Sequence, residues 1–122
     1  MTETDTNDST DTLQKYGSAF QCKTIKCLID DKEFLEQTHD IIDTEYWESE
    51  SHKWIVGEIL SYFDEYKQTI TLDVFKIKTE DVVIDSLKAS VVDQLRHIFI
   101  QVEALDADFV KHEFLTFCKN QK

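Results

Sequence analysis

The sequence contains no proline and only two glycines in 122 residues. Hairpin turns depend on residues that tolerate positive φ, and folds built only of strands need many such turns. This scarcity argues against an all-β fold, and the hydrophobic fraction of 41% argues against a wholly disordered chain. A chain of this length can form one domain with a substantial core. We therefore expect an all-α fold whose helices are separated by Ser, Thr, Asp and Asn caps.

Other absences bear on function. Neither Gly17 nor Gly57 lies in a phosphate-binding loop, which argues against nucleotide binding by a P-loop. The 25 acidic and 13 basic residues give a net charge of −12, so neutralising nucleic-acid phosphates is not expected to be the main function. The chain shows no signal-peptide pattern and no apolar run near membrane-spanning length. We expect a cytoplasmic protein without membrane contact whose cysteines, Cys22, Cys27 and Cys118, are reduced.

Patterns for metal binding and nucleophilic catalysis are weak. Glu36 and His39 form an ExxH, which places a carboxylate and an imidazole on one helical face, but di-iron bundles need a second such pair and two further glutamates. The cysteine spacing matches no known zinc arrangement, so buried small hydrophobes are the better interpretation. A cysteine–histidine nucleophile pair stays an alternative, although no glycine-containing turn supports it. We expect no catalytic residue, metal or cofactor in this chain.

The first fifteen residues are rich in Ser, Thr, Asn and Asp and almost devoid of apolar side chains. Such a composition cannot bury enough apolar area to offset chain entropy, so a disordered acidic tail is expected over residues 1–15. The domain should therefore occupy residues 16–122.

Apolar periodicity then predicts about six helices. Their approximate ranges are 18–30, 30–42, 49–67, 68–81, 81–105 and 106–122. Ser49 is a good N-cap for the third helix. In the fourth range, Ile70, Leu72 and Val74 alternate as in a strand, but a short helix capped by Thr71 is preferred because an isolated strand would have no partner. The fifth range, with apolar residues at three- and four-residue steps up to Leu105, predicts the longest helix.

Trp54 lies off the apolar arc of its helix, on the face that carries Glu58. It could fold back over Tyr46 and Trp47 and close the loop above the core. Alternatively it could anchor a protein–protein interface, where tryptophan is enriched. The last helix adds an apolar stripe to the candidate surface. The full set of candidate interface residues is Trp47, Trp54, Phe109, Val110, Phe114 and Phe117.

One segment of the chain resembles a known family. Its sequence is YGSAFQCKTIKCLIDDKEFLEQTHDIIDTEYWESESHKWIVGEILSYFDEYKQTITLDVF. Four features of this segment are similar to the N-terminal domain of DnaB-like replicative DNA helicases of the tailed-phage type. They are LIDDKEFL, DIID followed by EYWES, ESHKWI, and EYKQTITLDVF. The resemblance covers roughly residues 16–122. The family commonly has Pro where Thr69 or Ile70 stands and Phe where Trp47 stands, and these are mild departures.

The resemblance implies a helical head leading into a helical hairpin. In that family, heads and hairpins pair between subunits into a collar on a hexameric ring, which also docks primase or a helicase loader. ATP, Mg²⁺, single-stranded DNA translocation and helicase activity belong to a motor domain downstream, so this chain itself is expected not to be an enzyme.

The resemblance also implies that the chain ends inside the first hairpin helix, as the front of a longer product that lacks its motor. The stripe of Val110, Phe114 and Phe117 would then be covered by a missing hairpin arm, and the piece would at most dimerise. The alternative is a free-standing acidic all-α adaptor.

Overall fold

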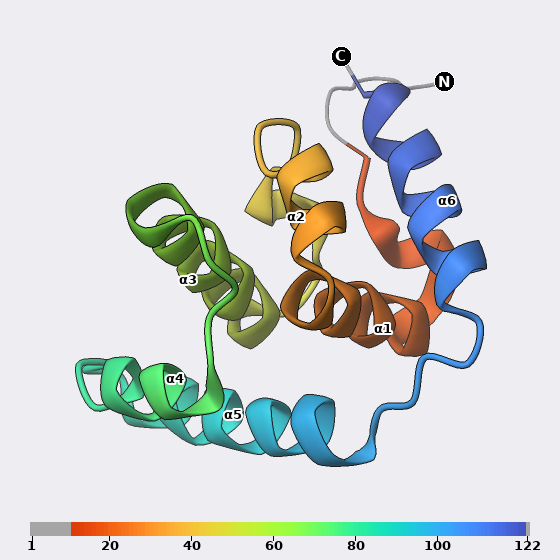
Figure 1. Cartoon of the computed structure of the whole chain (residues 1–122). Coiled ribbons are helices and arrows are strands. Elements are labelled where there is room, and N and C mark those ends of the chain that lie inside the picture. Colours follow the sequence, from red (N-terminus) through yellow and green to blue (C-terminus); the bar gives the residue numbers. More distant parts are fainter. Residues whose placement is uncertain (1–10, 122) are drawn as a thin grey trace.

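The computed structural model describes residues 11–121, and within that range it contains six α-helices and no strand (Figure 1). The helices are α1 (Gly17–Asp30), α2 (Lys32–Thr38), α3 (Glu50–Tyr66), α4 (Leu72–Thr79), α5 (Asp85–Arg96) and α6 (Ala107–Lys119). Two short 3₁₀ turns, η1 (Leu13–Tyr16) and η2 (Thr44–Tyr46), and one π-helical turn, η3 (His97–Gln101), complete the elements. The predicted all-α fold of about six helices is confirmed.

Polar caps delimit the helices, as the sequence predicts. The Ser49 hydroxyl accepts a hydrogen bond from the backbone N–H of His52 at 3.1 Å, and the Thr71 hydroxyl accepts one from Val74 at 3.3 Å. These bonds satisfy backbone donors that have no partner within the first helical turn. Helix α3 ends where Lys67 takes a left-handed conformation with φ 57°, a position usually given to glycine. The helical alternative for residues 68–81 is therefore correct.

The predicted long helix is shorter than expected. Helix α5 ends at Arg96, and the chain then makes a π turn in which the Val102 N–H donates to the His97 carbonyl at 3.0 Å. A π turn adds a residue to the helical repeat and so rotates the side chains that follow it. Ile98 is fully buried, whereas Leu105 is 93% exposed and lies outside the helix. The prediction of one helix reaching Leu105 is wrong for this reason.

The predicted tail boundary also needs correction. Leu13, in η1, is fully buried in the core, and the Asp11 N–H donates to the Gln121 side-chain carbonyl at 3.1 Å. A single well-placed apolar side chain is enough to dock a polar segment onto a domain. Residues 11–15 therefore belong to the fold, while the part of the predicted tail over residues 1–10 lies outside the described residues.

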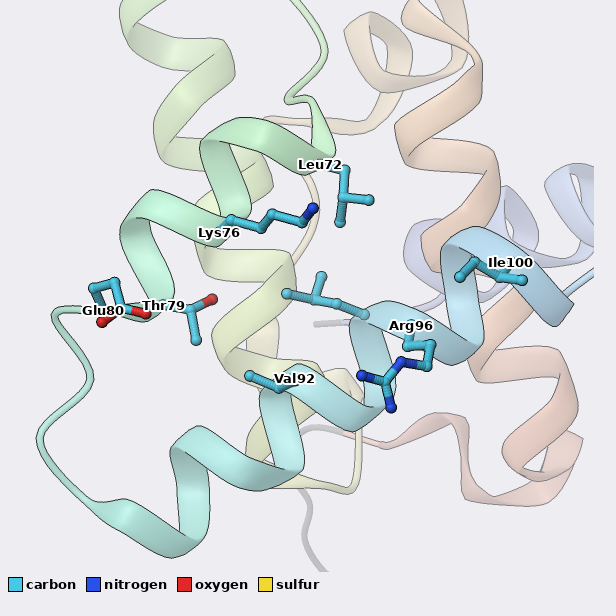
Figure 2. A pocket seen from close by; sticks show the side chains of 8 residues that line it. Leu72, Lys76, Thr79, Glu80, Val92, Arg96 and Ile100 are labelled. Atoms are coloured by element: carbon cyan, nitrogen blue, oxygen red, sulfur yellow. The ribbon is translucent and has the colours of Figure 1, made fainter.

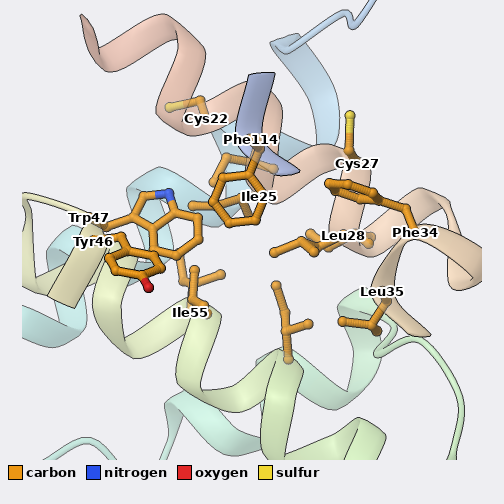
Figure 3. Packing of buried hydrophobic residues seen from close by; sticks show 14 of the residues in the cluster. Cys22, Ile25, Cys27, Leu28, Phe34, Leu35, Tyr46, Trp47, Ile55 and Phe114 are labelled. Atoms are coloured by element: carbon orange, nitrogen blue, oxygen red, sulfur yellow. The ribbon is translucent and has the colours of Figure 1, made fainter. Parts of the chain in front are cut away.

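Helix α1 lies at the centre of the domain. It packs against α2, α3, α6 and η3, while α3 packs on α5, and α4 lies against α5 (Figure 1). Figure 3 shows the core where Trp47 and Phe114 meet beside Ile25, with ring centroids of the two aromatics 5.6 Å apart. The layout leaves α4 and α5 at one side of the molecule and the aromatic core at the other.

Candidate functional site

Most of the predicted interface residues are buried. Trp47 and Phe114 are fully buried, Val110 is 1% exposed and Phe117 is 3% exposed. A side chain at this depth cannot contact a partner unless the domain opens. The prediction that these four residues form an interface is therefore wrong.

The apolar stripe of α6 is covered by the rest of the domain. Phe114 makes an edge contact with Phe34 of α2, with ring centroids 6.1 Å apart. Phe117 makes a similar contact with Tyr46 of η2, at 5.0 Å. Within the described residues, α2, η2 and Trp47 cover this stripe, so it is buried without the hairpin arm that the resemblance implies.

The two other candidates reach the surface. Phe109 is 58% exposed, and Trp54 is partly buried with its ring 6.4 Å from that of Phe75 in α4. Trp54 therefore links α3 to α4 instead of closing the loop over Tyr46 and Trp47. Its remaining surface lines a shallow hollow together with Val83, Ile84, Leu87 and neighbouring polar residues. Interface anchoring by Trp54 stays a prediction.

A polar cluster joins α1, α3 and α5, and we call Cys22, His52 and Gln94 the Cys22 cluster. The His52 Nε2 lies 2.7 Å from the Gln94 side-chain oxygen, and the Cys22 sulfur lies 3.7 Å from that same nitrogen. Cys22 and His52 are each 6% exposed. The cysteine–histidine pair that the sequence left open is thus brought together in space.

The electrostatics of the Cys22 cluster oppose nucleophilic chemistry. Burial raises the pKa of the Cys22 thiol. Burial also lowers the pKa of His52, against the opposing effect of the hydrogen bond that the ring shares with the Gln94 side-chain oxygen, which accepts it. An activated thiol needs the reverse, a depressed thiol pKa beside a basic or protonated imidazole. Burial raises the pKa of Cys27 to about 11 and of Cys118 to about 12, so all three cysteines behave as neutral buried groups.

His52 makes stability depend on pH. The unfolded chain binds the imidazole proton near pH 6.5, but the folded chain binds it only at lower pH because burial lowers the pKa of His52. The stability from neutral His52 is therefore complete above about pH 6.5 and is lost as pH falls toward its folded-state pKa. Between about pH 7 and about pH 5, His52→Gln is expected to flatten the fall in unfolding free energy measured by urea titration.

The control for this prediction is His112→Gln, because His112 is exposed on α6. That variant should keep the wild-type pH dependence. Equal slopes for the two variants would show that His52 contributes nothing to the acid sensitivity.

His39, the histidine of the ExxH pattern, has a structural role. The His39 ring lies 5.0 Å from the ring of Phe63, and its Nδ1 lies 3.9 Å from an Asp64 carboxylate oxygen. His39 thus packs against α3 instead of pairing with Glu36. Within residues 11–121, no three or more His, Cys, Asp or Glu side chains gather as metal ligands would.

A groove between α4 and α5 is the site that sequence reasoning missed. It encloses about 430 Å³ (Figure 2). Its lining residues, which define the α4–α5 groove, are Leu72, Lys76, Thr79, Glu80, Val92, Leu95, Arg96 and Ile100. No spacing in the sequence indicates this site, because only the packing of two helices makes it a groove.

Comparison with protein-family models, curated proteins and solved structures found no match to this chain. In the part of the chain that the structure describes, every helix is too short or too polar to cross a bilayer.

Proposed function

We propose that this chain is a cytoplasmic protein-docking domain that uses its α4–α5 side to bind other proteins. One observation carries the proposal. Five of the nine large hydrophobic side chains that are exposed in the described residues lie between residues 77 and 100. They are Ile77, Val83, Ile84, Val92 and Ile100. Exposed apolar side chains that gather on one side of a domain are typical of interaction surfaces.

The more specific proposal is a collar domain of a DnaB-like replicative DNA helicase of phage type. It is supported by the LIDDKEFL, EYWES and ESHKWI segments and by the all-α fold. In this role the domain would help to assemble a ring and would dock primase or a helicase loader. It would carry no catalytic residue, and unwinding with ATP and Mg²⁺ on single-stranded DNA would require a separate motor domain.

A second candidate is a free-standing acidic adaptor. It is favoured by the burial of Phe114 and Phe117 within this chain, since α6 needs no further arm to cover its apolar stripe. The two candidates differ in their partners, because only a helicase collar should bind a primase or a loader.

Calorimetric titration of the whole chain with the helicase-binding domain of a bacterial-type primase, and separately with a helicase loader, tests the collar proposal. We expect binding of one of them, with an affinity weakened by about 2 kcal/mol in Trp54→Ala if this side chain anchors the contact. Light scattering should show a monomer or dimer, and ATPase activity should be absent.

Thermal unfolding of Trp54→Ala serves as the control, because the contact with Phe75 gives this residue a share in stability. The comparison is valid as long as the variant is folded at the titration temperature. Failure of the wild-type chain to bind either partner would reject the collar and promote the adaptor.

A further inference from the structure

The α4–α5 groove combines an apolar lining with an accessible rim. Leu95 is 4% exposed and forms part of its floor, whereas Val92 is 42% exposed and Ile100 is 72% exposed. Figure 2 shows Val92, Arg96 and Ile100 following one another along α5 and η3, opposite Leu72 on α4. From Val92 to Ile100 the groove wall extends about 12 Å at the helical rise of 1.5 Å per residue. This length matches two to three turns of a docked helix.

Ile100, which lies in the π turn, extends this wall. Residues 97–101 form η3 directly after α5, and Ile100 follows the fully buried Ile98 by two positions, so the two side chains face opposite sides of the helix. Ile100 consequently stands at the end of the groove with most of its surface exposed. Single π turns are frequent at functional sites.

Two cations, Lys76 and Arg96, border the groove without an acidic partner among residues 11–121. Within residues 11–121, neither Lys76 nor Arg96 has a carboxylate oxygen within 4.0 Å of its charged nitrogens. The acid that lines the groove, Glu80, is engaged by Lys88 at 3.5 Å. By contrast, Lys111 on α6 lies 2.7 Å from an Asp31 carboxylate oxygen.

We propose that the α4–α5 groove binds an acidic amphipathic helix of a partner protein. Its apolar residues, spaced i, i+3 or i+4 and i+7, would fill the space between Leu72, Val92 and Ile100, as in other helix-in-groove complexes. Its carboxylates would meet Lys76 on one side and Arg96 on the other. Charge complementarity of this kind sets orientation and selects among partners. The proposal rests on the docking function above, for which it names the face and the chemistry of the partner.

The wild-type chain can be tested with a displayed library of random peptides about four helical turns long. The selected peptides are expected to combine helically spaced apolar residues with flanking Asp or Glu. Their amide shift perturbations should cluster on the groove residues. The double variant Lys76→Glu/Arg96→Glu should weaken their binding about tenfold or more, as should Ile100→Ser, which alters an exposed side chain.

The matched control is Lys32→Glu/Lys119→Glu, which makes the same change in net charge at exposed positions on α2 and α6. It should leave peptide binding within about twofold of wild type, a difference of about 0.4 kcal/mol. If both double variants weaken binding equally, general charge and not the groove selects the peptides, and the proposal is overturned.

Three further results would overturn it: selected peptides that are basic, no selected peptide at all, or wild-type self-association that Ile100→Ser abolishes. The last result would make a second copy of this chain the occupant of the groove.

Binding of primase or loader is measured separately. Acidic peptides in the groove without primase or loader binding would reject the collar and keep this inference. Primase binding that the groove variants leave unchanged would keep the collar and reject the groove as its docking face.

Discussion

Replacing Trp47 by alanine is expected to lower the free energy of unfolding by about 4 kcal/mol. The side chain is fully buried, packs against Phe114 with ring centroids 5.6 Å apart, and donates its indole N–H to the Gln21 carbonyl at 3.2 Å. The variant would lose the transfer free energy of the indole, leave a cavity and remove a buried hydrogen bond. Urea unfolding followed by far-ultraviolet circular dichroism measures the change.

The matched control is Phe109→Ala, which removes an aromatic ring that is 58% exposed on α6. Surface substitutions of this kind usually change stability by less than about 0.5 kcal/mol. A result in which both variants cost the same small amount would contradict the burial of Trp47. It would restore this residue to the candidate interface.

The helices could be predicted from the sequence because their causes are local. Ser49 and Thr71 accept backbone hydrogen bonds only a few residues away, and both caps stand where they were expected. The π turn at His97 could not be predicted, because the apolar period continues through it. The apolar periodicity of the sequence shows only which residues are apolar. Tertiary contacts determine where the helix ends.

The interface residues were mispredicted because apolar periodicity does not distinguish a stripe that meets the domain's own core from one that meets a partner. Phe114 and Phe117 are covered by residues from α2 and η2, which lie far from them in the sequence. The Cys22 cluster and the α4–α5 groove share this property. Each needs side chains from separate helices, and no spacing in the sequence predicts that these side chains lie together.

Gln21 is the clearest residue that sequence reasoning overlooked. It is 2% exposed on α1, and its amide NH₂ donates to a Glu48 carboxylate oxygen at 2.8 Å and to the Leu13 carbonyl at 3.4 Å. Its side-chain oxygen accepts the Glu48 N–H at 3.3 Å. One buried amide therefore fastens both η1 and the segment before α3 to the central helix. A glutamine within an amphipathic helix gives no sign of this role in the sequence.

Gln21→Ala is accordingly expected to cost about 3 kcal/mol of unfolding free energy, since each buried polar group left without a partner costs about 1–3 kcal/mol. Thermal and urea unfolding measure the loss, and amide exchange should show that Leu13 and Glu48 lose protection before the rest of the core. Gln37→Ala is the control, because Gln37 is exposed on α2, and it should change stability by less than about 0.5 kcal/mol. If the two variants unfold alike and amide exchange at Leu13 is unchanged, the Gln21 side-chain amide does not hold η1 to the central helix. The packing of Leu13 would then hold η1 to the domain by itself.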